Sequence, residues 1–94
     1  MPAQQFEWNA EKARSNLTRH GVSFEEAVTV FQDFMSFSIS DPDHSQGEHR
    51  YIELGRSTSG RLLVVSYTER ASVIRIISAR RATRKEVRDY EEGI

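Results

Sequence analysis

The sequence contains no cysteine, only two prolines and five scattered glycines, and no apolar run long enough to cross a membrane. Without cysteine, neither a disulfide scaffold nor a thiolate metal site can form. The glycines make no phosphate-binding loop, and no G-x-S-x-G nucleophile motif is present. The N-terminus lacks the apolar core of a signal peptide. We therefore expect a cytoplasmic protein with no membrane partner.

A chain of 94 residues with 37% hydrophobic residues predicts one domain, 1–94, with a modest core. Its first part indicates helices. Asn9 is a plausible N-cap for a helix over Ala10–Arg19 that ends at Gly21, and Ser23 and Glu26 fit a capping box for a helix that runs to about Gln32. In the first helix, two apolar residues predict the core-facing side and three polar ones a second stripe: Ala13 and Leu17, and Lys12, Asn16 and His20.

Beyond Asp33 the apolar period changes to two, which predicts strands. In the strand at 50–56, Tyr51, Glu53 and Gly55 should face one side and Ile52 and Leu54 the other. The run 62–65 is apolar on both faces, as in a central strand. Segment 6–8 fits an edge strand or an extended lead-in. The prediction is an α+β fold with two N-terminal helices, a four-stranded antiparallel meander (36–40, 50–56, 62–69, 73–79) and a C-terminal helix over 84–91, which begins with a capping box of Thr83 and Glu86.

The stretch Val73–Arg88 is the most basic part of the chain, with six Lys/Arg and the single acid Glu86. Paired arginines at a helix start suit a phosphate, although a solvated basic surface fits equally well. Residues 1–55 carry a net charge of −5 and residues 56–94 a net charge of +4. This asymmetry could steer an anion to one face, draw the two halves together, or meet an acidic partner protein.

Acid–base chemistry on a phosphate is the reaction that the remaining polar residues could support. Cutting RNA requires a base for the 2′-OH, cations for the phosphate and an acid for the leaving oxygen. The possible bases and acids are His20, Glu69, Tyr67 and Lys12, and the possible charge stabilisers are Arg80, Arg81 and Arg70. Potential metal ligands between Asp41 and His49 match no EF-hand or zinc spacing, and Asp-Pro-Asp is typical of a turn, so no metal or other cofactor is expected.

Strand alternation places Tyr67 and Glu69 on one face, and Arg75, Ile77, Ala79 and Arg81 on one face of the next strand. A hairpin could thus bring Tyr67, Glu69 and an arginine into one cleft. Two simpler interpretations stand beside this one. Glu69 and Arg75 could form a cross-strand ion pair, and His20 could simply favour a helix C-terminus.

Three segments together resemble the BrnT family, toxins of bacterial type II toxin–antitoxin modules: F-E-W-N-A-E-K-A-R-S-N-L-T-R-H-G-V-S-F-E-E-A, G-R-L-L-V-V-S-Y-T-E-R and I-R-I-I-S-A-R-R-A-T-R-K-E-V-R-D-Y-E. The likeness extends from Phe6 to Glu91. It implies a RelE-like fold and a ribonuclease that blocks translation. It also implies neutralisation by a BrnA-type antitoxin with a ribbon-helix-helix domain, in a heterotetramer that contacts operator DNA only through the antitoxin.

Several residues match the family pattern: Lys12, Asn16, His20, Gly21, Glu69, Arg70, Arg80, Arg81, Tyr90 and Glu91. Tyr67 departs from the family pattern, since many similar sequences have histidine immediately before the T-E-R motif. Tyrosine titrates far above neutrality, which shifts the expected base to Glu69 or His20.

We therefore expect a metal-independent endoribonuclease with two groups of site residues: catalytic Glu69, Arg80, Arg81, His20, Lys12 and Tyr67, and phosphate-binding Arg70, Arg75, Arg84 and Lys85. One alternative is a non-catalytic module that acts in an autorepression complex. In another, the arginines pair with acids of residues 1–55 and have a structural role only.

Overall fold

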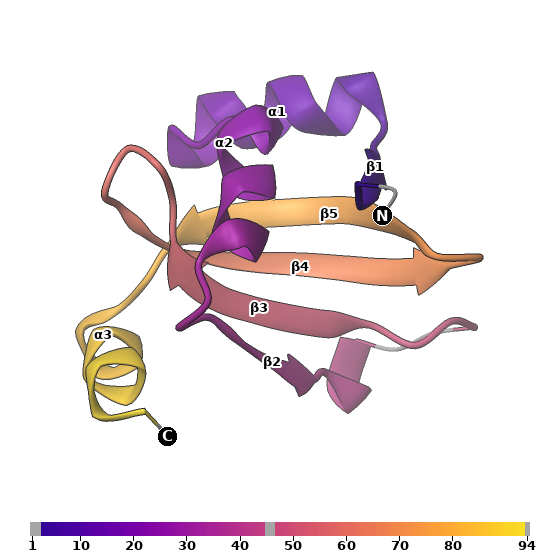
Figure 1. Cartoon of the computed structure of the whole chain (residues 1–94). Coiled ribbons are helices and arrows are strands. Elements are labelled where there is room, and N and C mark those ends of the chain that lie inside the picture. Colours follow the sequence, from indigo (N-terminus) through magenta and orange to yellow (C-terminus); the bar gives the residue numbers. More distant parts are fainter. Residues whose placement is uncertain (1–2, 45–46, 94) are drawn as a thin grey trace.

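A computed structural model describes residues 3–44 and 47–93. Within these residues, three helices and five strands form an α+β arrangement around one sheet (Figure 1). The elements are β1 (Gln5–Glu7), α1 (Ala10–His20), α2 (Phe24–Thr29), the 3-10 turn η1 (Val30–Gln32), β2 (Phe37–Ser40), the 3-10 turn η2 (Pro42–His44), β3 (Tyr51–Arg56), β4 (Leu62–Arg70), β5 (Val73–Arg81) and α3 (Arg84–Glu92).

The sheet has the order β1-β5-β4-β3-β2, and β2 to β5 form the predicted antiparallel meander. The prediction of four strands is wrong in one respect, because β1 adds a fifth strand parallel to β5 and the sheet is mixed. Phe6 in β1 lies opposite Ile74, and its ring packs 5.3 Å from that of Phe31. Burial of this aromatic side chain therefore holds the short segment on the sheet edge.

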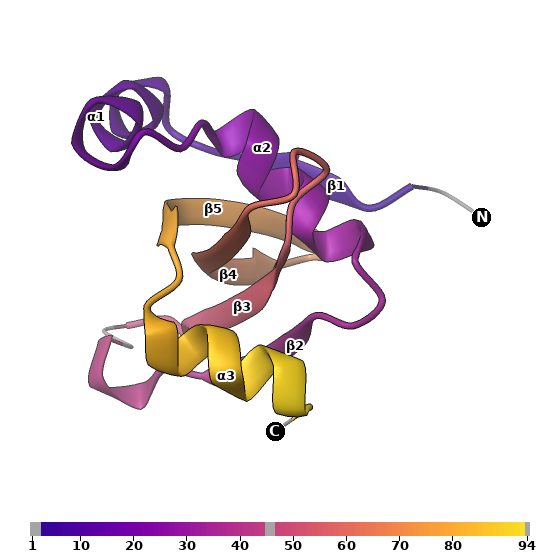
Figure 2. The same cartoon turned by 90° about the vertical axis from the view of Figure 1, so that its left-hand side faces the viewer.

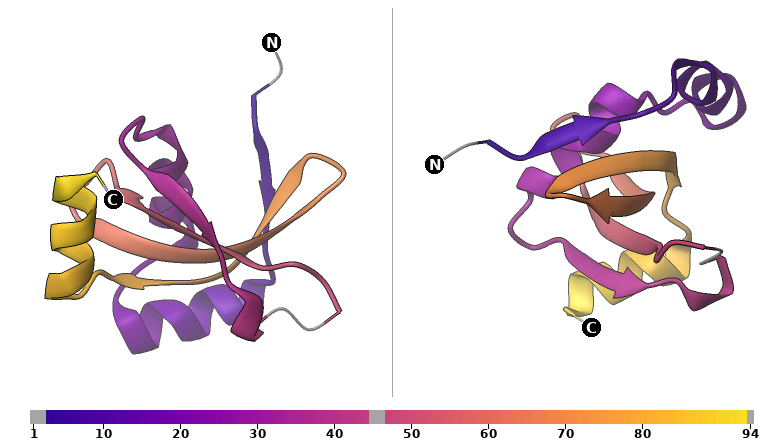
Figure 3. Two further views of the ribbon diagram at one scale, coloured as in Figure 1. Left: turned by 90° about the horizontal axis from the view of Figure 1, so that it is seen from below. Right: turned by 90° about the vertical axis from the view of Figure 1, so that its right-hand side faces the viewer.

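Helices cover both faces of the sheet. Figures 2 and 3 show α1 and α2 on one face, called here the α1/α2 face, and α3 across one end of the other, the α3 face. Leu63 and Val65 are buried with Phe24 on the α1/α2 face, and Leu62 and Val64 contribute to a smaller cluster under α3. The prediction that the run 62–65 is apolar on both faces is therefore confirmed.

Helix α1 begins and ends as predicted, with Asn9 as N-cap and Gly21 in the left-handed conformation at φ 69°. The prediction that Ala13 and Leu17 both face the core is wrong for Leu17. Ala13 packs against the core, but Leu17 is 52% exposed and Asn16 is buried in its place. The Asn16 amide donates to the carbonyls of Val22 and Ala79 and accepts from the Ala79 N–H, so this side chain ties α1 to β5.

A β-bulge changes the alternation of side chains along β5. The pairing steps from Ser66–Ser78 to Tyr67–Ile76, which leaves Ile77 as an extra residue. Ile76 and Ala79 consequently both belong to the core on the α1/α2 face. The prediction that Arg75, Ile77, Ala79 and Arg81 share a face is therefore wrong, because unbroken alternation does not hold through a bulge.

Candidate functional site

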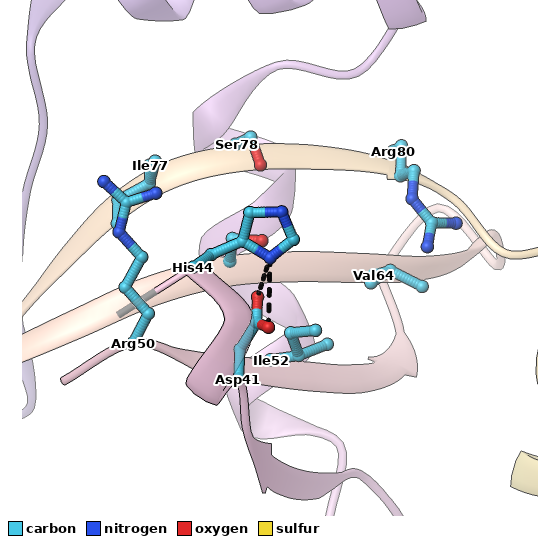
Figure 4. A pocket seen from close by; sticks show the side chains of 9 residues that line it. Asp41, His44, Arg50, Ile52, Val64, Ile77, Ser78 and Arg80 are labelled. Atoms are coloured by element: carbon cyan, nitrogen blue, oxygen red, sulfur yellow. Dashed lines mark hydrogen bonds and ion pairs between the residues drawn. The ribbon is translucent and has the colours of Figure 1, made fainter. Parts of the chain in front are cut away.

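Two hollows adjoin at the bulge of β5. The first, of about 270 Å³, opens on the α3 face of the sheet (Figure 4). Its walls come from the turn η2, from β3, β4 and β5, and from the residue just before β3. The lining residues are Asp41, His44, Arg50, Ile52, Val64, Ser66, Ile77, Ser78 and Arg80.

The second hollow, of about 230 Å³, lies between α1 and the same part of β5. Five residues of α1 line the second hollow: Lys12, Ser15, Asn16, Arg19 and His20. Ile77 and Ser78 of β5, which also line the first hollow, complete it. The predicted polar stripe of Lys12, Asn16 and His20 therefore faces one hollow. We call the two hollows together the bulge groove, because Ile77 and Ser78 belong to both.

Basic side chains dominate the bulge groove. Lys12 and Arg19 stand on the α1 side, and Arg50 and Arg80 on the α3 side. Asp41 is the one carboxylate in the lining of the two hollows among the described residues. Guanidinium and ammonium groups distributed over both sides of a strand edge suit an extended anion such as a nucleic-acid backbone, which carries a charge at every phosphate.

Arg80 is held in place by Glu86 at the start of α3. Its two terminal nitrogens each lie 2.9 Å from a different carboxylate oxygen of Glu86, a bidentate arrangement. The same carboxylate accepts from the Thr83 N–H and so completes the predicted capping box. The hydrogen bonds from Arg80 lower the pKa of Glu86 to about 2, and the pKa of Arg80 is raised. The Arg80 side chain remains 42% exposed, so a fixed cation faces the groove.

Three of the predicted phosphate-binding residues are engaged in ion pairs elsewhere. Arg75 contacts Glu7 at 2.7 Å and Arg70 contacts Glu48 at 2.8 Å, each an acid of the first half of the chain. Lys85 pairs with Asp89 within α3. Arg61 likewise pairs with Glu26. Three arginines of residues 56–94, namely Arg61, Arg70 and Arg75, therefore pair with acids of residues 1–55, as one interpretation of the charge asymmetry predicted. Arg80 is not one of them, because it pairs with Glu86.

Arg81 and Arg84 are exposed, and in the part of the chain that the structure describes they lie outside the lining of both hollows. Their predicted roles in catalysis and phosphate binding therefore stay predictions. Of the predicted site residues, the fold gathers three at the bulge groove: Lys12, His20 and Arg80.

Tyr67 is buried in the core rather than exposed in a cleft. Its hydroxyl lies 2.7 Å from the Ser38 hydroxyl and donates to Glu53 at 3.3 Å, while its ring stacks on Tyr51. Burial raises the pKa of Tyr67 still further above neutrality. Tyr67 therefore serves the packing of the α1/α2 face.

Glu69 lies at the far end of the β4–β5 hairpin from Arg80. It is opposite Ile74, whereas Arg80 is opposite Val64, five residues earlier in β4. This separation corresponds to about 17 Å along a strand. The prediction that Tyr67, Glu69 and an arginine meet in one cleft is therefore wrong, and Arg75, which pairs with Glu7, does not form the alternative ion pair with Glu69 within the described contacts.

Four charged or titratable lining residues were missed as site residues by the sequence analysis: Asp41, His44, Arg50 and Arg19. The first two were read as turn chemistry, and a 3-10 turn does form there. Among residues 3–44 and 47–93, the potential metal ligands do not gather into groups of three or more. His44 and Arg80 line one hollow because segments far apart in the sequence pack together, and short-range sequence patterns do not specify such packing.

The fold and groove define a small α+β domain with a cationic surface suited to a phosphodiester. The chain matches the family model for BrnT, the ribonuclease toxin of a type II toxin–antitoxin system, over residues 8–86. It is also similar in structure to the Brucella abortus ribonuclease toxin BrnT, known from a 1.1 Å crystal structure. The TM-score is 0.66 at 22% identity, with 87% of this chain and 100% of that chain covered. A search of curated proteins finds no match.

The protein therefore belongs to the BrnT family of ribonuclease toxins. This membership confirms the resemblance found in the sequence, and it implies an antitoxin partner and RNA targets. None of the helices in the described residues has the length and apolar character needed to span a membrane.

Proposed function

We propose that this protein is an endoribonuclease toxin that cleaves RNA at the bulge groove without a metal ion and thereby inhibits translation in the cytoplasm. The observation that carries the proposal is the junction of two cationic hollows at Ile77 and Ser78, with Arg80 in one and Lys12 and His20 in the other. An RNA strand crossing the edge of β5 would contact both.

The chemistry is transesterification by the 2′-OH. The 2′ oxygen attacks phosphorus, the bond from phosphorus to the 5′ oxygen breaks, and negative charge grows on the phosphoryl oxygens. Arg80 would stabilise that charge. Its two hydrogen bonds to Glu86 hold the guanidinium in position before RNA binds. His20 and Lys12 can supply the proton that the departing 5′ oxygen requires. Glu69 and Tyr67 have no part in this proposal, since one lies far along the hairpin and the other in the core.

The test is cleavage of a purified RNA by the isolated protein in EDTA. Wild-type protein should yield fragments with 2′,3′-cyclic phosphate and 5′-hydroxyl ends, and an RNA with 2′-O-methyl groups should stay intact. Arg80→Ala should reduce the rate by about 10²- to 10³-fold, as expected for loss of one charge-stabilising group. Arg88→Ala removes the same charge from an exposed position on α3 and serves as the matched control.

Two results would contradict the proposal. Equal cleavage by wild type and Arg80→Ala would remove the bulge groove as the site. No cleavage and no growth arrest by wild type would leave the non-catalytic module as the better explanation. Growth arrest without cleavage of free RNA would point to a ribosome-dependent activity.

We further propose a BrnA-type antitoxin with a ribbon-helix-helix domain as the partner, in a heterotetramer that contacts operator DNA only through the antitoxin. Support comes from membership of a type II toxin–antitoxin family. Co-expression with such an antitoxin should abolish growth arrest, and light scattering of the purified complex should give two copies of each chain. A 1:1 complex, or DNA binding by the toxin alone, would contradict this arrangement.

A further inference from the structure

We propose that His44, oriented by Asp41, is the general base of the cleavage reaction. This assignment rests on the proposed ribonuclease function and names the group that accepts the 2′-OH proton. It starts from a histidine–carboxylate pair at the wall of the hollow that also contains Arg80, outside every residue that the sequence analysis considered catalytic.

The pair has a fixed carboxylate and an open imidazole. Nδ1 of His44 lies 3.1 and 3.0 Å from the two carboxylate oxygens of Asp41. The Asp41 side chain is only 15% exposed, whereas that of His44 is 69% exposed. The Asp41 backbone N–H donates to the carbonyl of Arg50, and the His44 N–H donates to the carbonyl of Asp41, so the turn η2 is tied to the start of β3.

This geometry selects the tautomer that a base requires. A carboxylate that accepts from Nδ1–H leaves the lone pair on Nε2 of the neutral ring, and the carboxylate stabilises the imidazolium once Nε2 has taken a proton. A purely structural ion pair with Asp41 would not require Nε2 of His44 to be accessible to a ligand. Here the ring borders the groove, and Figure 4 shows it between Arg50 and Arg80.

The charged groups that line the hollow with His44 come from three segments. Asp41 immediately precedes η2, Arg50 precedes β3, and Arg80 comes from β5 and pairs with Glu86. The guanidinium of Arg80 can bind a phosphate, and the imidazole of His44 lines the same hollow, together with Ser66 and Ser78. The hollow therefore contains both an anion-binding group and a proton acceptor.

The step balances without a further reactant. The 2′-OH proton moves to Nε2 of His44, the bond between the 2′ oxygen and phosphorus forms, and the bond to the 5′ oxygen breaks. The 5′ oxygen receives a proton from His20 or Lys12 in the adjoining hollow. The products are a 2′,3′-cyclic phosphate and a 5′-hydroxyl, and the imidazolium then returns its proton to water.

His49 provides a matched control for the experiment. It is also exposed and lies five residues beyond His44, but it contacts Ser40 at 3.0 Å and packs its ring 4.6 Å from that of Tyr51. We compare wild type, His44→Ala, His49→Ala and Asp41→Asn on RNA in EDTA. His44→Ala should lower kcat by about 10²- to 10⁴-fold and leave KM within threefold, the range typical for loss of a general base. His49→Ala should cleave like wild type.

Two further readouts separate catalysis from a structural role. The rise of kcat with pH should disappear in His44→Ala, because no imidazole remains to accept the proton of the 2′-OH. Added imidazole should restore part of the activity to His44→Ala and to none of the other variants. Asp41→Asn should lower kcat less and shift the rising limb, as expected of a positioning residue. All variants should keep the wild-type unfolding midpoint within a few degrees.

The outcomes are distinguishable from failure of the proposed function. Cleavage by wild type and by His44→Ala at rates within threefold overturns the assignment of His44 alone. Failure of wild type to cleave any RNA overturns the ribonuclease proposal and the assignment together. An equal loss in His44→Ala and His49→Ala, without imidazole rescue, would show a structural role of the loop and would also overturn the assignment.

Discussion

The interaction between Arg80 and Glu86 allows a prediction in which stability and RNA binding change in opposite directions. Glu86→Gln keeps a side chain that can close the capping box of α3 with Thr83, since glutamine serves at that position as well as glutamate. It removes the negative charge that faces Arg80. We therefore expect a less stable protein that binds RNA more tightly.

The magnitude of the stability change follows from the pKa of Glu86, which falls from 4.5 to about 2 in the folded protein. A shift of this size corresponds to at most about 3 kcal/mol at neutral pH. Because the Arg80 side chain is 42% exposed, solvent screens much of this interaction. We expect a loss of about 1 kcal/mol in the free energy of unfolding.

The pH dependence has a definite sign. A carboxyl group with a lowered pKa in the folded state contributes its stability above the unfolded pKa, here near 4.5, and loses it as the pH falls toward about 2. The difference between wild type and Glu86→Gln should therefore be constant from pH 8 to about 5.5 and should shrink below about 4.5. Urea unfolding followed by circular dichroism at pH 7, 5 and 3 measures it.

RNA binding should strengthen because one carboxylate beside the bound phosphate is gone. A unit charge 4 to 8 Å from a phosphate in a water-like medium contributes about 0.5 to 1 kcal/mol of repulsion, which corresponds to a two- to fivefold change in Kd. Fluorescence anisotropy with a 2′-O-methyl RNA measures this without cleavage. Asp89→Asn is the matched control, because it removes the same charge from α3 at a site paired with Lys85.

The reasoning would be refuted if Glu86→Gln bound RNA no more tightly than Asp89→Asn. It would also be refuted if the stability difference from wild type stayed the same at pH 3 as at pH 7. The first result would show that Arg80 and Glu86 do not lie next to the bound RNA. The second would show that the charge of Glu86 does not stabilise the fold.

Three other predictions concern stability. Asn16→Ala should cost about 2 to 4 kcal/mol in urea unfolding, because it leaves polar backbone groups of β5 buried without their partner; a loss below 1 kcal/mol would contradict this. The double change Ala71→Asn, Ser72→Gly should raise the unfolding midpoint by several degrees, since both residues have positive φ (49° and 71°) in a two-residue hairpin loop that favours Asn-Gly; an unchanged or lower midpoint would contradict it. Glu26→Gln should destabilise at pH 7 and much less at pH 3, because hydrogen bonds from Arg61 lower the pKa of Glu26 to about 2, and equal destabilisation at both pH values would contradict this cause.

The comparison of Glu69 with Arg80 shows where sequence reasoning reached its limit for the site. Both residues are polar, adjacent to strand ends and part of the family resemblance, so the sequence placed them together. In the hairpin they occupy opposite ends of β4 and β5. Antiparallel pairing brings the end of one strand to the beginning of the next, and residues near the turn cannot meet residues at the open end.

His44 and Asn16 illustrate the opposite error. The sequence places the segment of His44 in a turn and Asn16 in a polar stripe, but it predicts neither a place for His44 beside the site nor the burial of Asn16. Asn16 nevertheless bonds to Ala79, 63 residues further along the chain, and His44 borders the same hollow as Arg80. These contacts depend on how elements pack, which short-range patterns do not specify.

The sequence by itself determined the order of helices and strands, the caps at Asn9, Ser23 and Thr83, the two-faced burial of β4 and membership of the BrnT family. These features depend on side-chain periodicity and on hydrogen bonds between residues a few positions apart. Tertiary structure alone decided the parallel addition of β1, the bulge at Ile77, and the presence of His44 and Arg80 in the lining of one hollow. Each of these depends on contacts between segments far apart in the sequence, and those contacts are set by the packing of the whole core.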